Sequence, residues 1–212
     1  MTGMTPARTS PPTDAPPLGL RERKKIKTRT AIRDATYALI KEQGYDATTI
    51  EQIAERADVS PSTVFRYFPT KEDIVLTDEY DPLILEELRH RPADEPWIES
   101  LRYVMRKAVL VGLEQEPEIT RLRSLLLVQV PAVRARMRES ISTTSRMLAG
   151  AVAERTGWDP DSLEVRVYTM SLISGFGEIS LYWAENDFRD ELFDLVDRTV
   201  DVLANGLPTR KP

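Results

Sequence analysis

The sequence predicts an all-α fold, in which a short three-helix N-terminal head with a helix-turn-helix precedes a larger helical bundle. From residue 21 onward, apolar residues recur three and four positions apart, which is the spacing of amphipathic helices. Prolines and glycines separate these stretches. No segment keeps the alternation of a β-strand, and the sequence has no glycine-rich phosphate loop and no internal repeat.

The first two helices of the head are expected at residues 23–43 and 50–57. Apolar residues of the first helix, Ile32 among them, form one stripe, and Gly44 has the position of its C-terminal stop. Thr49 has the position of an N-cap for the second helix, because its side-chain oxygen can accept a bond from a free backbone N–H. This second helix is only about two turns long, and its apolar residues share one face.

A tight three-residue corner that ends at Ser60 leads into the third helix, which we expect at residues 61–68. Ser60 is the expected N-cap, and Pro61 follows at the first helical position, where its missing N–H leaves no bond unmade. Pro69 ends this helix because it disfavours helical geometry in the residue before it. Thr70 can then cap the next helix.

Beyond the head, prolines and Gly157 separate further expected helices. These lie at roughly 71–80, 83–91, 96–115, 118–130, 132–156, 162–186 and 190–205. The expected division of the chain is a proline-rich disordered tail, a head, a ligand-binding and dimerisation bundle, and a short C-terminal tail. The four segments are residues 1–20, 21–75, 76–206 and 207–212.

The composition excludes several classes of protein. Hydrophobic residues make up 41% and charged residues 30% of the 212 residues, as in ordinary globular domains. Without cysteine, disulfides and cysteine metal sites are excluded, and the single histidine, His90, makes an imidazole metal site or a catalytic dyad a poor interpretation. We expect no catalytic residue, metal or cofactor. Because the sequence shows neither a secretory signal nor the ~18 apolar residues of a membrane span, we expect a cytoplasmic protein.

Charge is distributed unevenly along the chain. The formal net charge is −5, but residues 1–75 carry 12 Lys and Arg against 10 Asp and Glu, a net of +2, and the remainder carries −7. Most of the basic excess lies in residues 21–29. An acidic body with a basic front end is typical of a protein that binds DNA at one end. The alternative is that the basic run is simply solvated.

The two short helices and the corner between them have the features of a helix-turn-helix. The inner residues Ile53, Val59 and Val64 would fix the angle between the helices. The outer residues of the second helix are hydroxyls and a guanidinium, which can reach phosphates or base edges. The geometry alone is not decisive, since any all-α protein contains short helices with turns between them.

The identities of the residues in this segment are more specific than its geometry. The segment TTIEQIAERADVSPSTVFRYFPTKEDIV, residues 48–75, closely resembles the DNA-binding signature of the TetR family of bacterial regulators. With the preceding helix, the resemblance covers about residues 23–75. Two residues depart from the family pattern, Asp58 and Ser62, where the family often has glycine. Aspartate tolerates a positive φ better than most residues, whereas Ser62 at a DNA-facing position can alter which bases are read.

The resemblance implies a duplex DNA operator as partner and a set of residues that contact it. The implied contact residues, with three from the basic arm, are Arg23, Lys24, Lys27, Thr49, Ser60, Ser62, Thr63, Phe65, Arg66, Tyr67 and Lys71. Arg66 is the candidate for a bidentate guanine contact, and Thr49, Tyr67 and Lys71 would hold phosphates. Phe65 has two interpretations, contact with a thymine methyl group or packing inside. Tyr67 is expected to be half core and half phosphate donor, and Phe68 and Ile74 to be core.

The basic arm is expected to reach phosphate or the minor groove beside the recognition helix. We disfavour a helix lying on a membrane because the basic residues surround the start of the helix instead of forming one stripe. A solvated run of charge remains the alternative.

For the body, the family resemblance implies a bundle that dimerises and often encloses a ligand. Apolar residues wrap more than one face of residues 162–186, so this helix should be buried on several sides. We therefore expect a homodimer through the last two helices, with Gly175 and Gly177 allowing close approach. Glu178 is an expected solvated residue or, alternatively, an anchor for a cation or a dimer contact. Arg134, Arg136 and Arg138 suggest an anion patch, but helical spacing favours a solvated helix.

Residues that line an apolar ligand pocket are difficult to select from the sequence, since each candidate could equally be an ordinary core residue. The candidates are Tyr103, Met105, Leu110, Leu126, Met147, Tyr168, Met170 and Phe176. The favoured function is a dimeric repressor that an apolar small molecule releases from its operator. The alternative is a DNA-binding regulator without a small-molecule ligand, and a helical enzyme is a weak third hypothesis.

Overall fold

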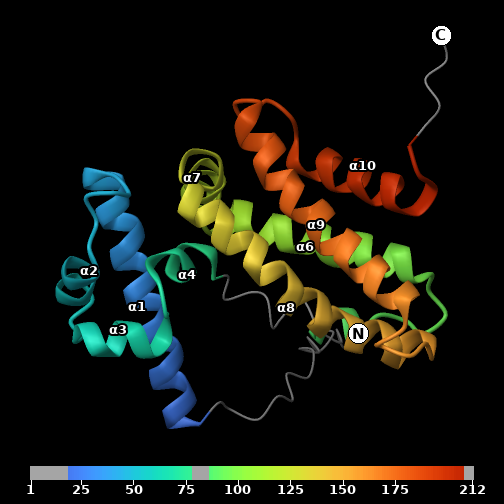
Figure 1. Cartoon of the computed structure of the whole chain (residues 1–212), viewed down its shortest axis with the longest axis horizontal. Helices are drawn as coiled ribbons and strands as arrows, with labels where there is room; N and C mark the ends of the chain where they lie inside the picture. Colours follow the sequence, from blue (N-terminus) through green and yellow to red (C-terminus); the bar gives the residue numbers. More distant parts are fainter. Residues whose placement is uncertain (1–18, 78–85, 208–212) are drawn as a thin grey trace, which may run out of the picture.

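The computed structural model describes residues 19–77 and 86–207, and within these ranges it contains helices and no strand (Figure 1). The all-α prediction is confirmed. The helices of the head are Leu20–Gln43 (α1), Ile50–Arg56 (α2), Pro61–Tyr67 (α3) and Lys71–Leu76 (α4). The helices of the bundle are Trp97–Gln115 (α6), Pro117–Gln129 (α7), Pro131–Thr156 (α8), Leu163–Glu185 (α9) and Leu192–Asn205 (α10).

The head is held by helix caps and one apolar core. The Thr49 side chain accepts a bond from the Gln52 backbone N–H, and the Gln52 side chain accepts one from the Thr49 N–H, so the pair forms a capping box. Ser60 caps α3 in the expected way, with Pro61 at the first position. Gly44 ends α1 at a φ of +86°, which favours glycine. The core residues are Ile32, Ala35, Leu39, Ile53, Ala54, Val64, Phe68 and Ile74.

The bundle is organised around α9. This helix packs against α7, α8 and α10, and α6 packs against α7 and α10 (Figure 1). Leu172, Ile179 and Trp183 of α9 are buried, in two different apolar clusters, so the prediction that this helix is covered on several sides is confirmed. No helix in the described ranges has the length and apolar character needed to cross a membrane.

Several expected boundaries were wrong by a few residues. Helix α4 ends at Leu76, and not near residue 80, because Thr77 has extended backbone angles. Helices α7 and α8 begin at Pro117 and Pro131 themselves, since proline is well suited to the first helical position. Of the helix expected at 83–91, residues 86–89 are helical, and 83–85 lie outside the described residues. Most of both expected tails also lies outside them.

Candidate nucleic-acid interface

The corner between α2 and α3 sets the direction of the recognition helix. Asp58 has a φ of +54°, so the departure from the family's glycine is accommodated by a left-handed aspartate. The Val59 backbone N–H donates to the Ala54 carbonyl at 2.9 Å, and Val64 of α3 is fully buried. These contacts lock the apolar side of α3 onto α2 and leave the other side outward.

The outward side of α3 presents the predicted polar residues to solvent. Ser62 and Arg66 are exposed, and Thr63 is half-buried. Phe65 is 52% exposed, which decides between its two interpretations, because it does not pack inside. The Ser60 hydroxyl lies 2.8 Å from that of Ser62 and 2.9 Å from that of Thr63. The face therefore offers a cluster of hydroxyls, an aromatic ring and a guanidinium.

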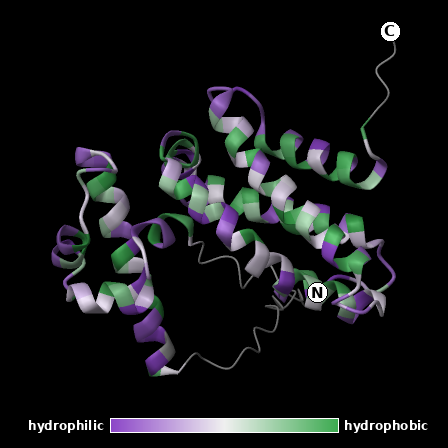
Figure 2. Cartoon of the chain, viewed as in Figure 1, coloured by the Kyte–Doolittle hydropathy of each residue, from purple (hydrophilic) through white to green (hydrophobic). Residues whose placement is uncertain are grey.

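A second feature lies beside α3, where the hydrophilic N-terminal end of α1 passes its C-terminal end (Figures 1 and 2). A hollow of about 710 Å³ opens here, which we call the basic hollow. Its lining residues are Arg21, Lys24, Lys25, Thr28, Arg29, Arg66 and Tyr67. Arg66 lies over the Tyr67 ring, with its guanidinium carbon 5.3 Å from the ring centroid, and Arg29 lies over Phe68 at 4.7 Å. The hollow concentrates positive charge next to the recognition face.

The basic hollow corrects the expectation for the arm. Of the three arm residues predicted, Lys24 lines the hollow, whereas the exposed Arg23 and Lys27 do not. The basic residues do surround the start of α1, since Arg23 and Lys27 lie away from the hollow, but a subset of them shares one face. Arg21, Lys24 or Lys25, and Thr28 are three and four positions apart, so they share one face of α1. That spacing is the signal by which they could have been found.

Lys71 has a structural role that the sequence did not reveal. Its ammonium group donates to the carbonyls of Tyr45 and Thr48, both at 2.8 Å, and lies 3.9 Å from the centre of the Tyr45 ring. Burial lowers the pKa of Lys71 and raises the pKa of Tyr45, whose hydroxyl donates to Glu72. Two of the three ammonium donors therefore hold the turn after α1. Only the third is left for the predicted phosphate contact.

The head joins the bundle through α4, which packs against both α1 and α8. The Tyr37 hydroxyl of α1 donates to the Val75 carbonyl at 2.8 Å. Val75 itself is buried in a cluster that spans the two parts of the chain. The buried members of this cluster are Ile40, Val75, Leu126, Leu127, Val133 and Leu181.

Three ion pairs also cross this junction. The Arg33 side chain, only 8% exposed, pairs with Glu116 between α6 and α7. Lys41 pairs with Glu118 at the surface, 2.5 Å apart. Arg136 of α8 contacts Asp73 of α4 at 2.7 Å, which raises the pKa of this guanidinium. These ion pairs connect α7, α8 and the turn before α7 to α1 and α4.

The anion patch considered for α8 does not form. Arg134 donates to the Leu127 and Val128 carbonyls at the end of α7, and Arg136 is paired with Asp73 and Glu139. Arg138 is exposed. Arg134 therefore caps the C-terminal end of α7, and Arg136 links the bundle to the head.

The eight residues predicted for a ligand pocket lie in different surroundings within the described part of the chain. Tyr103, Leu110, Met147 and Met170 are exposed, and Leu126 is buried between head and bundle. The remaining three, Met105, Tyr168 and Phe176, pack against the main bundle core. Their contact with a ligand stays a prediction, since an apolar residue type does not distinguish a cavity wall from a filled core.

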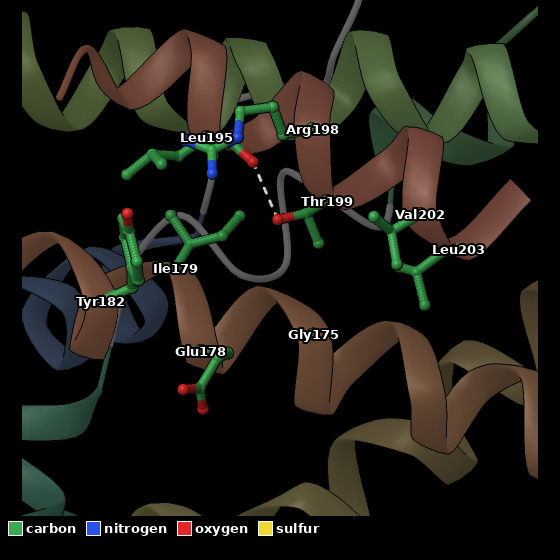
Figure 3. A pocket seen from close by; sticks show the side chains of 9 residues that line it. All are labelled: Gly175, Glu178, Ile179, Tyr182, Leu195, Arg198, Thr199, Val202 and Leu203. Carbon is green, nitrogen blue, oxygen red and sulfur yellow. Dashed lines mark hydrogen bonds between the residues drawn. The ribbon is translucent and has the colours of Figure 1, made fainter. Parts of the chain in front are cut away.

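A groove lies instead between α9 and α10 (Figure 3), with a volume of about 290 Å³. Its lining residues are Gly175, Glu178, Ile179, Tyr182, Leu195, Arg198, Thr199, Val202 and Leu203. Gly175 is in van der Waals contact with α10, since an added Cβ would lie 3.4 Å from Thr199 and Leu203, whereas Gly177 faces Met137 of α8. The Glu178 carboxylate is exposed and directed away from the α10 side chains (Figure 3).

Two sequence families match the chain. Residues 32–77 match the family described as "Bacterial regulatory proteins, tetR family", and residues 95–208 match the "MftR C-terminal domain". The chain is 32% identical over 152 residues to the "HTH-type transcriptional regulator TcmR" of Streptomyces glaucescens, a match that covers 68% of this chain and 66% of that protein. It is 24% identical over 186 residues to the "Fatty acid metabolism regulator protein" of Bacillus subtilis, covering 83% and 93%.

Solved structures show the same fold. The chain superimposes on the transcriptional repressor FadR of Thermus thermophilus, solved in complex with lauroyl-CoA, with a TM-score of 0.58, 24% identity and coverage of 87% and 97%. It superimposes on FadR of Bacillus subtilis, solved with stearoyl-CoA, with a TM-score of 0.57, 24% identity and coverage of 84% and 99%. The arrangement of a helix-turn-helix head on a helical bundle is common to all three.

Proposed function

Because the chain belongs to the TetR family of bacterial regulatory proteins, we propose that it is a sequence-specific DNA-binding repressor that an apolar small molecule releases from its operator. The observation that carries the DNA-binding part is the adjacency of the exposed face of α3 to the basic hollow. In this proposal α3 enters the major groove and the hollow receives the phosphate backbone beside it.

The contact residues divide into two groups. Ser60, Ser62, Thr63, Phe65 and Arg66 read base edges, and Arg66 donates both ends of its guanidinium to a guanine. Phosphates are held by Thr49, Tyr67 and the α1 residues of the hollow, with the third donor of Lys71 as a minor contact. Arg23 and Lys27 add to the positive potential at the end of α1 without lining the hollow.

The charge of the hollow makes a measurable prediction about salt. A dimer that contacts about 6–10 phosphates should lose roughly 10³–10⁵ in affinity between 50 and 200 mM salt. In Lys24→Gln one contact disappears from each protomer, so the slope of log K against log salt should become shallower by about 1.8. Fluorescence anisotropy with an operator duplex at several salt concentrations measures this. The matched control Arg138→Gln, on the exposed side of α8, should leave the slope unchanged, and equal slopes for both variants would contradict the phosphate role.

We further propose that the protein acts as a homodimer through α9 and α10. Support comes from apolar side chains left exposed on these helices in the single chain, among them Leu163, Val167, Tyr182 and Val202. A two-fold axis through this face would allow the two heads to bind successive major grooves, which are about 34–36 Å apart. One short recognition helix alone offers too few contacts for specific binding.

The effector is proposed as an apolar molecule of the acyl-thioester class, since the FadR neighbours were solved with lauroyl-CoA and stearoyl-CoA. Its effect would reach the head through α4 and the ion pairs of Arg33, Lys41 and Arg136. A ligand that favours one position of α7 and α8 would thereby alter the spacing of the two heads.

A second candidate is a regulator without a small-molecule ligand, which is supported by the exposure of four of the eight predicted pocket residues, Tyr103, Leu110, Met147 and Met170. Thermal unfolding of the protein in the presence of lauroyl-CoA, with free CoA as the control, distinguishes the two candidate functions. The first candidate predicts stabilisation by lauroyl-CoA alone, about 2.7 kcal/mol at a hundredfold excess over Kd, with loss of operator binding. If lauroyl-CoA and shorter and longer thioesters change neither the melting temperature nor DNA binding, the second candidate is favoured.

A further inference from the structure

A small hollow lined by aromatic side chains lies at the end of the bundle away from the recognition helix, whose place in the fold can be followed in Figure 1. It is formed by the first residue of α6, the last turns of α8, the turn that follows and the first turns of α9. Its volume is about 270 Å³. The lining residues are Trp97, Val152, Thr156, Trp158, Glu164, Val165 and Tyr168, and we call it the aromatic hollow.

Three of its walls are aromatic rings. Trp158 is 55% exposed, which is unfavourable for so large an apolar side chain unless a partner covers it. The Trp97 indole nitrogen is buried without a hydrogen bond of good geometry, although it lies near the Tyr168 hydroxyl. The hollow therefore offers π-faces, which attract cations through the ring quadrupole.

The hollow also contains one charge. Glu164 is the sole charged residue among those that line it, it is exposed, and in the described part of the chain it has no ion-pair partner. The nearest cations in sequence, Arg155 and Arg166, do not line the hollow. Arg155 lines a neighbouring hollow, where its guanidinium carbon lies 5.8 Å from the centroid of the Trp97 ring. It also donates to the Pro92 carbonyl at 2.6 Å and the Glu95 carbonyl at 2.8 Å.

We propose that the aromatic hollow binds a small organic cation, an alkylated ammonium whose charge lies between the Trp158 ring and the Glu164 carboxylate. Aromatic walls and one unpaired carboxylate together are complementary to such an ion. The volume of about 270 Å³ is slightly below the usual range for ligand sites, about 300–1,000 Å³, which favours a compact ion over a long acyl chain. The unpaired carboxylate also repels fatty acids and phosphates. The site is independent of the proposed DNA binding and of the acyl-thioester effector.

Choline is a suitable probe because 3,3-dimethylbutan-1-ol has the same shape without the charge. Trp97 and Trp158 line the hollow, whereas Trp183 is buried between α9 and α10, so tryptophan fluorescence of the full chain should change on binding above a constant background. The expected result is a saturable change with choline, beyond that caused by equal sodium chloride, and affinity for the neutral alcohol weaker by about 5–30-fold.

Variants make the test specific. Glu164→Gln keeps the shape of the side chain and should weaken choline binding by a similar factor, and Trp158→Leu should do the same. The matched control Glu185→Gln, an exposed glutamate at the other end of α9, should bind choline as the unaltered chain does. Circular dichroism checks that each variant is folded. The proposal is overturned if choline acts no differently from sodium chloride or the alcohol, or if Glu164→Gln binds as well as Glu185→Gln.

Discussion

Replacing Arg66 with alanine is expected to weaken operator binding by the dimer by about 30-fold to 10⁴-fold. Each protomer would lose a bidentate base contact, which contributes about 1–3 kcal/mol, and the dimer would lose two. Arg66 is exposed and lies over the Tyr67 ring, so the free energy of unfolding should change by less than about 0.5 kcal/mol. Discrimination between the operator and a duplex with the guanine replaced should disappear as well.

Two variants control this prediction. Arg66→Lys keeps the charge but lacks the planar pair of donors, so it should retain phosphate attraction and lose base discrimination. Arg56→Ala removes an exposed cation of α2 that is paired with Glu42 at 2.5 and 2.6 Å, and operator affinity should change by a few-fold at most. Equal losses for Arg66→Ala and Arg56→Ala in anisotropy titrations would show that Arg66 does not read a base.

Replacing Glu116 with glutamine is expected to cost about 3 kcal/mol of folding stability, the largest effect at the junction of head and bundle. The Arg33 side chain is 8% exposed and that of Glu116 is 23% exposed. Removal of the carboxylate leaves a buried guanidinium whose nearest other acid is Asp34 at 3.8 Å, and whose Nε has no hydrogen-bond partner. Breaking a buried pair by removing one partner costs about 3–5 kcal/mol, and partial exposure of Glu116 places this case at the lower end.

The chain contains a close control for this prediction. Glu118 also joins the bundle to α1, through Lys41, but its side chain is 82% exposed, so Glu118→Gln should cost less than about 1 kcal/mol. Urea unfolding followed by circular dichroism compares the two variants. If the free energy of unfolding falls by the same small amount in both variants, the Arg33–Glu116 pair does not hold the head to the bundle.

The sequence predicted local structure well because local signals determine it. Thr49, Ser60 and Gly44 occupy the cap and stop positions expected of them, since hydrogen bonding within a single turn decides each position. The outward face of α3 followed from helical spacing alone. The left-handed Asp58 agrees with the family's frequent glycine at this position, because aspartate tolerates a positive φ better than most residues.

Features that depend on tertiary contacts were not predicted. The basic hollow requires the start of α1 and the end of α3 to meet, and these are more than thirty positions apart. Lys71 was assigned to phosphate because nothing in its neighbourhood shows that the Tyr45 and Thr48 carbonyls would surround it. The ligand residues stay a prediction, since burial and pocket lining use the same apolar residue types.

DNase footprinting on the DNA that flanks the protein's own gene tests the central claim most directly. If the outward face of α3 and the basic hollow bind duplex DNA in a two-fold dimer, protection should cover two segments one helical turn apart. Arg66→Ala should abolish this protection at concentrations where Arg56→Ala retains it. Protection that is equal for both variants, or one unpaired protected segment, would contradict the claim that these residues form the operator-binding surface.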